Sequence, residues 1–222
     1  MCNLLINDNN MGINLKKNGR ALEYYKKTLK LTDLQRDIII GTLLGDSSIA
    51  KQKTKSYNIK VEQKLENKEY IIHLFFIFKD WCGTEPKIRK IKGGNAKDRE
   101  SIWFRTYRHN SFTFYYNLFY GGEKKSIPKL LHRYLNERVL AYWFMDDGTK
   151  AKSGYILNTQ SFTKADNLKL IAALNKNFGF NCSIFCDRDK FKIYINASDK
   201  KEFTLLIQPY ILDCFVYKLH SI

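Results

Sequence analysis

The chain has 222 residues and carries 38 Lys and Arg against 22 Asp and Glu, a formal net charge of +16. Such an excess favours a phosphate-bearing partner, because basic surfaces attract polyanions. A hydrophobic fraction of 44% with only 3 prolines argues against a disordered binder, and no apolar run approaches the roughly 18 residues that span a bilayer. The scattered cysteines form no C-x-x-C pair, so neither a zinc site nor a disulfide framework is indicated.

The polar residues 1–30 predict a basic N-terminal arm. Thr32 and Gln35 have the spacing of a capping box, in which the hydroxyl accepts an amide and the glutamine accepts the cap's own N–H. A helix is therefore predicted from Thr32 to Asp46.

Alternation of apolar and polar residues predicts strands in the rest of this half. Ile102 and Phe104 share one face of such a strand, while Trp103 and Arg105 share the other. The predicted elements are, in order, a strand over 57–65, a helix over 68–82, a basic ribbon that turns at Gly93-Gly94-Asn95, a strand over 101–107 and a helix over 110–120.

A second half repeats this order in fewer residues. Its predicted elements are a helix ending at Asp147, a strand over 155–161, a helix from Thr163 to about Gly179, strands over 182–187 and 191–197, and a helix over 199–212. We expect a first half over 31–120, a linker over 121–136 and a second half over 137–222. An internal repeat of this size is typical of a pseudo-two-fold pair of mixed α/β units.

Two apolar nonapeptides end close to an acid. They are Ile-Ile-Gly-Thr-Leu-Leu-Gly-Asp-Ser at 39–47 and Leu-Ala-Tyr-Trp-Phe-Met-Asp-Asp-Gly at 140–148. Both match the LAGLIDADG pattern, with Asp46 and Asp147 at its eighth position. The chain therefore resembles the two-motif, monomeric LAGLIDADG homing endonucleases, and among them the mitochondrial intron-encoded members.

The resemblance implies a centre formed by the two acids. The motif helices would pack side by side, and Asp46 and Asp147 would hold Mg²⁺, as two or three divalent ions for which Mn²⁺ substitutes. Two close carboxylates repel, and divalent cations offset that repulsion. The simpler alternative is that each acid caps a helix end, which the negative helix dipole disfavours there.

The resemblance also implies catalytic roles for residues around the acids. It makes Gln63 and Gln160 water-positioning groups, and Lys125 and Lys218 basic residues beside each active site. As alternatives, the glutamines are ordinary polar strand residues and the lysines are solvated surface residues.

Motif two departs from the family pattern, because Tyr142 and Asp146 stand where small residues are usual. Together with Gly41 and Gly45 on the other helix, Tyr142 predicts an asymmetric helix interface. Asp146 is expected to be a supporting carboxylate.

The fold that the resemblance implies is α+β, with two αββαββα halves whose antiparallel sheets form a saddle over duplex DNA. A two-stranded ribbon fits the major groove, where polar side chains distinguish base pairs. Candidates for base contacts on outward strand faces are Lys60, Arg105, Lys190, Lys192, Tyr194 and Asn196. Candidates for phosphate contacts, which supply affinity without sequence information, are Arg89, Lys90, Lys92, Lys150 and Lys152.

The leading hypothesis is a magnesium-dependent endonuclease that cuts both strands of a long asymmetric DNA target across the minor groove. It would act as a monomer without a membrane or protein partner, leave short 3′ overhangs and spread its own intron. The bias towards Lys, Asn, Ile, Tyr and Phe fits an AT-rich organellar gene. The alternatives are an RNA-binding intron maturase and a sequence-specific DNA-binding protein that does not cut.

Overall fold

The computed structural model describes residues 19–51, 56–93, 99–122, 124–187 and 190–221. Both halves follow the order αββαββα, which confirms the predicted fold class. The first half contains α2 (Asp33–Leu44), β1 (Ser48–Lys51), β2 (Tyr57–Lys64), α3 (Lys68–Phe78), β3 (Lys87–Ile91), β4 (Arg99–Arg105) and α4 (Thr113–Phe119). The second contains α5 (Glu137–Asp147), β5 (Gly148–Lys150), β6 (Tyr155–Leu157), α6 (Lys164–Phe178), β7 (Cys182–Asp187), β8 (Lys190–Ile195) and α7 (Lys200–Ile207).

Each half builds one antiparallel four-stranded sheet. The strand orders, β1-β2-β4-β3 and β5-β6-β8-β7, are equivalent. The alternation predicted from the sequence holds in β4 and β8, where Ile102, Phe104, Ile193 and Ile195 are buried on the core side. The opposite faces of these strands carry the polar and cationic residues, so each sheet has an apolar inner face and a polar outer face.

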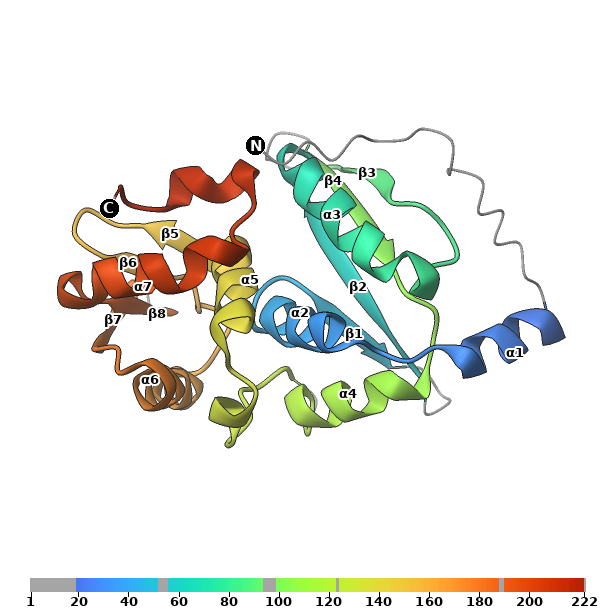
Figure 1. The fold of residues 1–222 in the computed structure, drawn as a ribbon, viewed down its shortest axis with the longest axis horizontal. Coiled ribbons are helices and arrows are strands. Elements are labelled where there is room, and N and C mark those ends of the chain that lie inside the picture. The colour runs from blue at the N-terminus through green and yellow to red at the C-terminus, as the bar shows by residue number, and fades with distance from the viewer. Residues whose placement is uncertain (1–18, 52–55, 94–98, 123, 188–189, 222) are drawn as a thin grey trace.

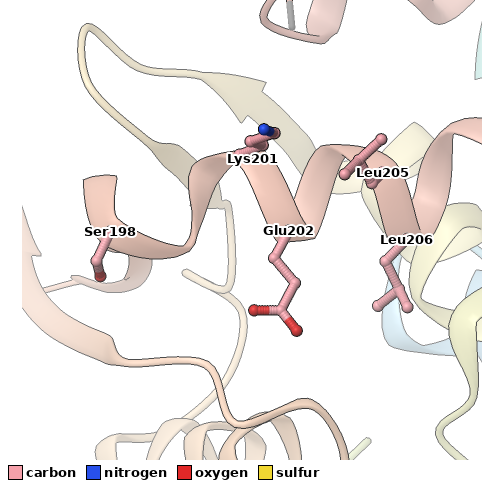
Figure 2. A pocket seen from close by; sticks show the side chains of 5 residues that line it. All are labelled: Ser198, Lys201, Glu202, Leu205 and Leu206. Atoms are coloured by element: carbon pink, nitrogen blue, oxygen red, sulfur yellow. The ribbon is translucent and has the colours of Figure 1, made fainter.

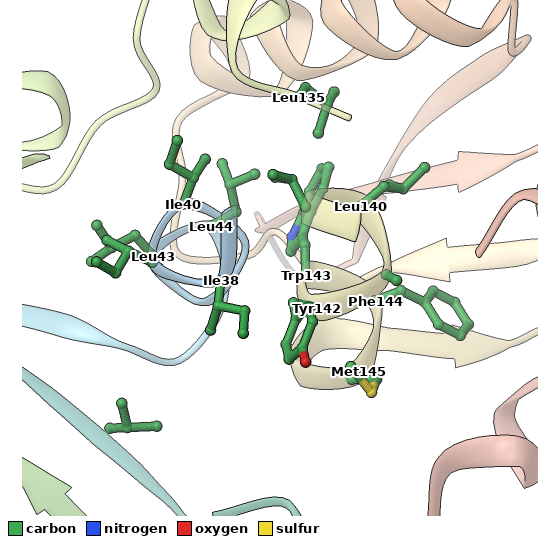
Figure 3. Close-up of a cluster of buried hydrophobic side chains, with 14 of the residues drawn as sticks. Ile38, Ile40, Leu43, Leu44, Leu135, Leu140, Tyr142, Trp143, Phe144 and Met145 are labelled. Atoms are coloured by element: carbon green, nitrogen blue, oxygen red, sulfur yellow. The ribbon is translucent and has the colours of Figure 1, made fainter. Parts of the chain in front are cut away.

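The two motif helices lie side by side between the sheets (Figure 1). In α2 every residue from Ile38 to Leu44 is buried, and in α5 every residue from Val139 to Met145 is buried. Figure 3 shows Ile38 and Leu44 of α2 beside Tyr142 and Trp143 of α5. A helix that is apolar on all sides is stable only when protein covers all sides. Helix α2 meets this condition by packing against α5, so the apolar motifs themselves hold the halves together.

A glycine sets how closely the two helices approach. A Cβ atom at Gly41 would lie 2.7 Å from the Val139 carbonyl oxygen and 2.8 Å from the Tyr142 Cβ. The large side chain at the contact belongs to α5, since Tyr142 packs over this glycine and its hydroxyl hydrogen-bonds His73 Nε2 at 2.8 Å. The interface is therefore asymmetric, as predicted.

The capping box at the start of α2 is present. The Gln35 N–H donates to Thr32 Oγ1 at 3.2 Å, and the Thr32 N–H donates to Gln35 Oε1 at 3.0 Å. The predicted end of this helix is wrong, because α2 stops at Leu44 and Asp46 lies in the following turn. That turn leads directly into β1, so Asp46 sits at the junction between the motif helix and the sheet.

Several predicted boundaries change because short 3₁₀ turns or irregular segments replace residues at either end of the expected elements. The predicted helices over 68–82, 110–120 and 199–212 shorten to α3, α4 and α7, with 3₁₀ turns over 79–81, 110–112, 197–199 and 208–210. The predicted strands over 101–107 and 191–197 become β4 and β8, which end earlier. The predicted strand over 155–161 is also too long, since β6 ends at Leu157 and leaves Gln160 in a turn.

Part of the predicted N-terminal arm is a helix, α1 (Arg20–Thr28), which contacts the first half. The Tyr25 hydroxyl donates to the Asp80 carbonyl at 3.0 Å, and His109 Nε2 hydrogen-bonds the Lys26 carbonyl at 2.9 Å. The rest of the arm, 1–18, and Gly94-Asn95 of the predicted turn lie outside the described residues. Among the helices described, none has the length and apolarity to cross a membrane.

Candidate functional site

The amide of Gln63 joins acids from the two halves at the carboxyl ends of the motif helices. Its Nε2 donates to Asp46 Oδ2 at 2.7 Å and to Asp146 Oδ1 at 3.2 Å. Asn67 Nδ2 donates to Gln63 Oε1 at 3.0 Å, which fixes the orientation of this amide. The Asp46 N–H also donates to Asp146 Oδ2 at 3.2 Å. Asp147 follows Asp146 directly, so the three carboxylates form one cluster at the junction of the halves.

Asp146 reaches Asp46 because a glycine lies opposite it. A Cβ atom at Gly45 would lie 2.4 Å from the Asp146 Cβ, so no other residue fits at position 45 without a shift. The sequence marked Asp146 only as a supporting acid. Its hydrogen bonds to the Asp46 backbone and to Gln63 were not predictable, because they depend on how the helices cross.

Both predicted lysines lie at the ends of the motif helices. Lys125 Nζ donates to the Gly45 carbonyl at 2.8 Å and to the Ser47 carbonyl at 3.1 Å, the residues on either side of Asp46. Lys218 Nζ donates to the Met145 carbonyl at 2.6 Å, just before Asp146 and Asp147 of the second motif. Cations at these positions satisfy helix-end carbonyls and balance the negative end of the helix dipole. Each lysine thus binds backbone carbonyls at the end of one motif, Lys125 from the expected linker and Lys218 from the second half.

Burial and mutual repulsion shift the titration of all three acids. Burial raises the pKa of Asp147 to about 7, and repulsion from Asp46 adds to the increase, while Lys125 and Lys218 oppose it. Burial also raises the pKa of Asp46, against the hydrogen bond from Gln63. For Asp146, burial and then repulsion from its two neighbours hold the pKa well above the usual range. The surroundings therefore disfavour the charged forms of these acids, and a bound cation would stabilise those forms.

The same surroundings act on the lysines. Burial lowers the pKa of Lys125 to about 8, although all three acids raise it. Burial also lowers the pKa of Lys218. Both ammonium groups therefore sit in a partly desolvated place, where a charge interacts more strongly than it does in water.

The second predicted glutamine does not join the cluster. Gln160 Nε2 donates to Asn158 Oδ1 at 3.5 Å, and it is Asn158 that reaches the motif, through a bond from Nδ2 to the Asp147 carbonyl at 2.8 Å. Because β6 ends at Leu157, the chain turns away before residue 160. The two halves therefore differ around the motif acids. Gln63 donates to the Asp46 carboxylate, whereas Asn158 donates to the backbone carbonyl of Asp147.

The donor set of the cluster fits a magnesium-like cation. Within the described ranges, no three His, Cys, Asp or Glu side chains form a cation site by themselves. Mg²⁺ usually takes one or two carboxylates and completes its octahedron with water and substrate phosphate oxygens. Asp46 and Asp147 both keep part of their surface in contact with solvent, so they match that requirement.

The predicted DNA-binding residues all lie on strands or at strand ends. In the first sheet, Lys60 and Arg105 pair across β2 and β4, and both cations lie over the Trp103 ring, at 5.5 and 5.7 Å from its centre. Arg89 and Lys90 belong to β3, and Lys92 follows it. The outer face of the first sheet therefore presents an ordered group of cations.

The second sheet presents a different set. Lys192 lies over the Phe185 ring at 5.7 Å, and Asn196 accepts a hydrogen bond from the Ser183 hydroxyl at 3.2 Å. Lys150 donates to the Leu219 carbonyl at 3.1 Å. Tyr194 and Lys190 lie along β8, and Lys152 is exposed in the turn after β5. The outer faces are thus chemically unequal.

A shallow groove runs along α7, lined by Ser198, Lys201, Glu202, Leu205 and Leu206 (Figure 2). It contains none of the predicted site residues. The predicted catalytic and metal-binding residues therefore lie at or near the acid cluster at the ends of the motif helices, and not in this groove.

Comparison with known proteins identifies this arrangement. The model of the LAGLIDADG DNA endonuclease family matches residues 36–203, a stretch that begins within α2 and includes α5 and the strands β1 to β8 of the described residues. The chain belongs to the LAGLIDADG DNA endonuclease family. The matched stretch also contains Asp46, Asp146 and Asp147, so the acid cluster described above falls within the family region.

Relatives of this LAGLIDADG protein cover nearly its whole length. Probable intron-encoded endonuclease 1 of Wickerhamomyces canadensis is 37% identical over 220 residues, which is 93% of each chain. The solved structure of the homing endonuclease I-WcaI bound to its DNA recognition sequence aligns with a TM-score of 0.87 and 34% identity, over 95% of this chain and 96% of that one. Cytochrome b mRNA maturase bI2 of Saccharomyces cerevisiae is 31% identical over 82% of this chain and 46% of its own length.

The pKa of Asp147 predicts how stability depends on pH without metal. Its folded value of about 7 exceeds the ordinary 3.8, so the folded state binds the proton more tightly than the unfolded state. The stability that protonated Asp147 contributes is full below about pH 4 and is lost as the pH rises through 7. We expect Asp147→Asn to raise the melting temperature at pH 8 in EDTA, with no gain at pH 4. A lower melting temperature at pH 8 would contradict the assigned repulsion.

Proposed function

We propose that the protein is a site-specific, magnesium-dependent homing endonuclease that cuts both strands of duplex DNA. The cluster at the ends of α2 and α5 carries the proposal, because Gln63 ties acids of the two halves together between two outer faces rich in cations. The DNA-bound I-WcaI structure supports a duplex lying across both sheets, since the fold is shared over 95% of this chain. Proposed halves over 31–120 and 137–222, joined by a linker over 121–136, would each cover part of an asymmetric target.

The proposed roles follow from the contacts. Asp46 and Asp147 hold the cations, and Gln63 keeps the Asp46 carboxylate turned towards the junction. Lys125 and Lys218 place positive charge beside both acids, where it offsets negative charge that builds up on the phosphate in the transition state. A divalent cation held by Asp46 and Asp147 would supply charge stabilisation for the phosphate oxygens and would lower the pKa of a bound water. Gln160 has no contact that supports an equal role.

The single chain supplies one acid from each half, so we propose that a monomer cuts both strands. The target is long and asymmetric because the two outer faces differ, and cleavage leaves short 3′ overhangs across the minor groove. The biological result would be intron mobility in an organelle. That location agrees with the cytochrome b maturase among the relatives.

A second candidate function is intron maturation. The observation that favours it is the 31% identity to a cytochrome b mRNA maturase over 82% of this chain. A maturase uses its basic surface to bind intron RNA and needs no paired acids. The intact acid cluster therefore favours the endonuclease, although one chain can carry both activities.

The decisive test uses a plasmid that carries the joined exon sequence from the gene's own insertion site. We expect MgCl₂ to give linear product, EDTA to prevent it, and sequencing of the ends to show 3′ overhangs. A plasmid whose site is interrupted by the intron is the matched control and should remain uncut. Absence of linear product in both MgCl₂ and MnCl₂ would overturn the endonuclease, and splicing assistance with intron RNA would then establish the maturase.

A further inference from the structure

An acid lies among the cations on the outer face of the first sheet. Glu62 is in the middle of β2, and Trp103 of β4 lies opposite it. Its side chain is only 22% exposed, although it belongs to the polar face. Phosphate repels a carboxylate, so this residue reduces the general attraction that its neighbours create.

Glu62 binds partners on three strands of the sheet, β2, β4 and the edge strand β3. Its Oε1 accepts from Ser101 Oγ of β4 at 2.6 Å and from Arg89 Nη2 of β3 at 2.8 Å. Its Oε2 accepts from Lys60 Nζ of β2 at 2.5 Å. Two residues with predicted DNA contacts are thus held by one carboxylate.

This group is ordered and charged. Burial raises the pKa of Glu62, but the hydrogen bonds from Lys60 and Ser101 outweigh it and leave the pKa below its ordinary value. The Lys60 and Arg89 side chains are 34% and 52% exposed, and ion pairs this close to solvent add little stability. The contacts instead orient the Lys60 and Arg89 side chains, which are long and flexible and would otherwise sample many rotamers.

We infer that Glu62 is a specificity-determining residue, which fixes Lys60 and Arg89 for the target sequence and disfavours other DNA. The inference rests on the DNA-binding part of the function proposed above. On an unrelated sequence, unrestrained Lys60 and Arg89 would turn to the nearest phosphates and bind there. Held by Glu62, they keep donors in fixed positions that only a matching set of base and phosphate acceptors satisfies.

The test measures binding rather than cleavage. Wild-type protein and Glu62→Gln each select sequences from a random duplex pool in EDTA, and their affinities for the selected and unselected duplexes are compared over a range of KCl. We expect Glu62→Gln to bind the unselected pool about threefold to tenfold more tightly, with a log–log salt slope steeper by about one, because a released cation contacts an extra phosphate. The ratio of selected to unselected affinity should fall about tenfold, with the preference flattened at a few adjacent base pairs.

Two further variants separate charge from position. Glu100→Gln makes the same charge change in β4, three residues from Trp103 along the strand and on the alternate face from Ser101. We expect it to keep the wild-type affinity ratio. Glu62→Asp keeps the charge but shortens the side chain, so it should lose discrimination without the gain in general affinity. Equal melting temperatures verify that all variants fold.

The outcomes are distinct. An unchanged affinity ratio in Glu62→Gln overturns the inference, even if general affinity rises, and so does an equal loss in Glu100→Gln. Wild-type protein that selects no sequence also overturns it. Wild-type protein that selects a sequence but never cuts it rejects the endonuclease function, while the role of Glu62 is still decided by the affinity ratios.

Discussion

Asp46→Asn and Asp147→Asn are expected to lower the rate of DNA cleavage by about 10³-fold or more while DNA binding persists. Each change removes a proposed cation ligand, and several kcal/mol of transition-state stabilisation corresponds to that factor. Asparagine keeps the size of the side chain, and Asp147→Asn also removes repulsion within the cluster. Loss of activity in that variant would therefore not come from loss of folding.

The measurement is the single-turnover cleavage rate on end-labelled duplex, read separately for each strand. Asp33→Asn is the matched control, since it removes a fully exposed carboxylate from the opposite end of α2. Its rate should equal that of the wild type. Wild-type rates on both strands in either asparagine variant would reject the assigned chemistry.

Gly41→Ala is expected to destabilise the protein by about 1–3 kcal/mol, as overpacking does in dense cores. Alanine normally favours a helix over glycine by about 1 kcal/mol. Here the added methyl group meets the Val139 carbonyl at 2.7 Å and the Tyr142 Cβ at 2.8 Å, and neither atom lies at the end of a flexible chain. The helices must separate, which also moves Asp46 relative to Asp147. Stability and cleavage should fall together.

Urea unfolding followed by circular dichroism gives the change in free energy. Gly121→Ala is the control, because the nearest atom to its new Cβ is the Asn117 carbonyl oxygen at 3.8 Å. That variant should unfold at the wild-type urea concentration or slightly above it. Equal midpoints for the two alanine variants would show that close helix approach at Gly41 does not limit stability.

Local patterns were sufficient to predict most elements in their order, but not helix α1 or the short strands β1 and β5 that follow the motif helices. The capping box at Thr32 and Gln35 and the alternation in β4 and β8 depend on neighbours along the chain, and all are present. Element ends were less predictable, because the 3₁₀ turns after α3 and α7 share the composition of the helices they follow. Gln160 was expected beside the acids because it follows Asp147 at a spacing similar to that of Gln63 from Asp46. It lies outside the acid cluster because β6 ends at Leu157.

The sequence by itself determined the repeat, the two apolar motif helices and the acids at their ends. Helix period, strand alternation and charge depend on residues that are close together along the chain. Only the tertiary structure decided which side chains each acid contacts in the other half. Asp146 reaches across to the Asp46 backbone, Gln63 bridges both carboxylates, and Glu62 accepts hydrogen bonds from three strands, two of them from cations. These contacts depend on helix crossing at Gly41 and Gly45 and on strand register, which arise when distant segments pack and leave no local signal.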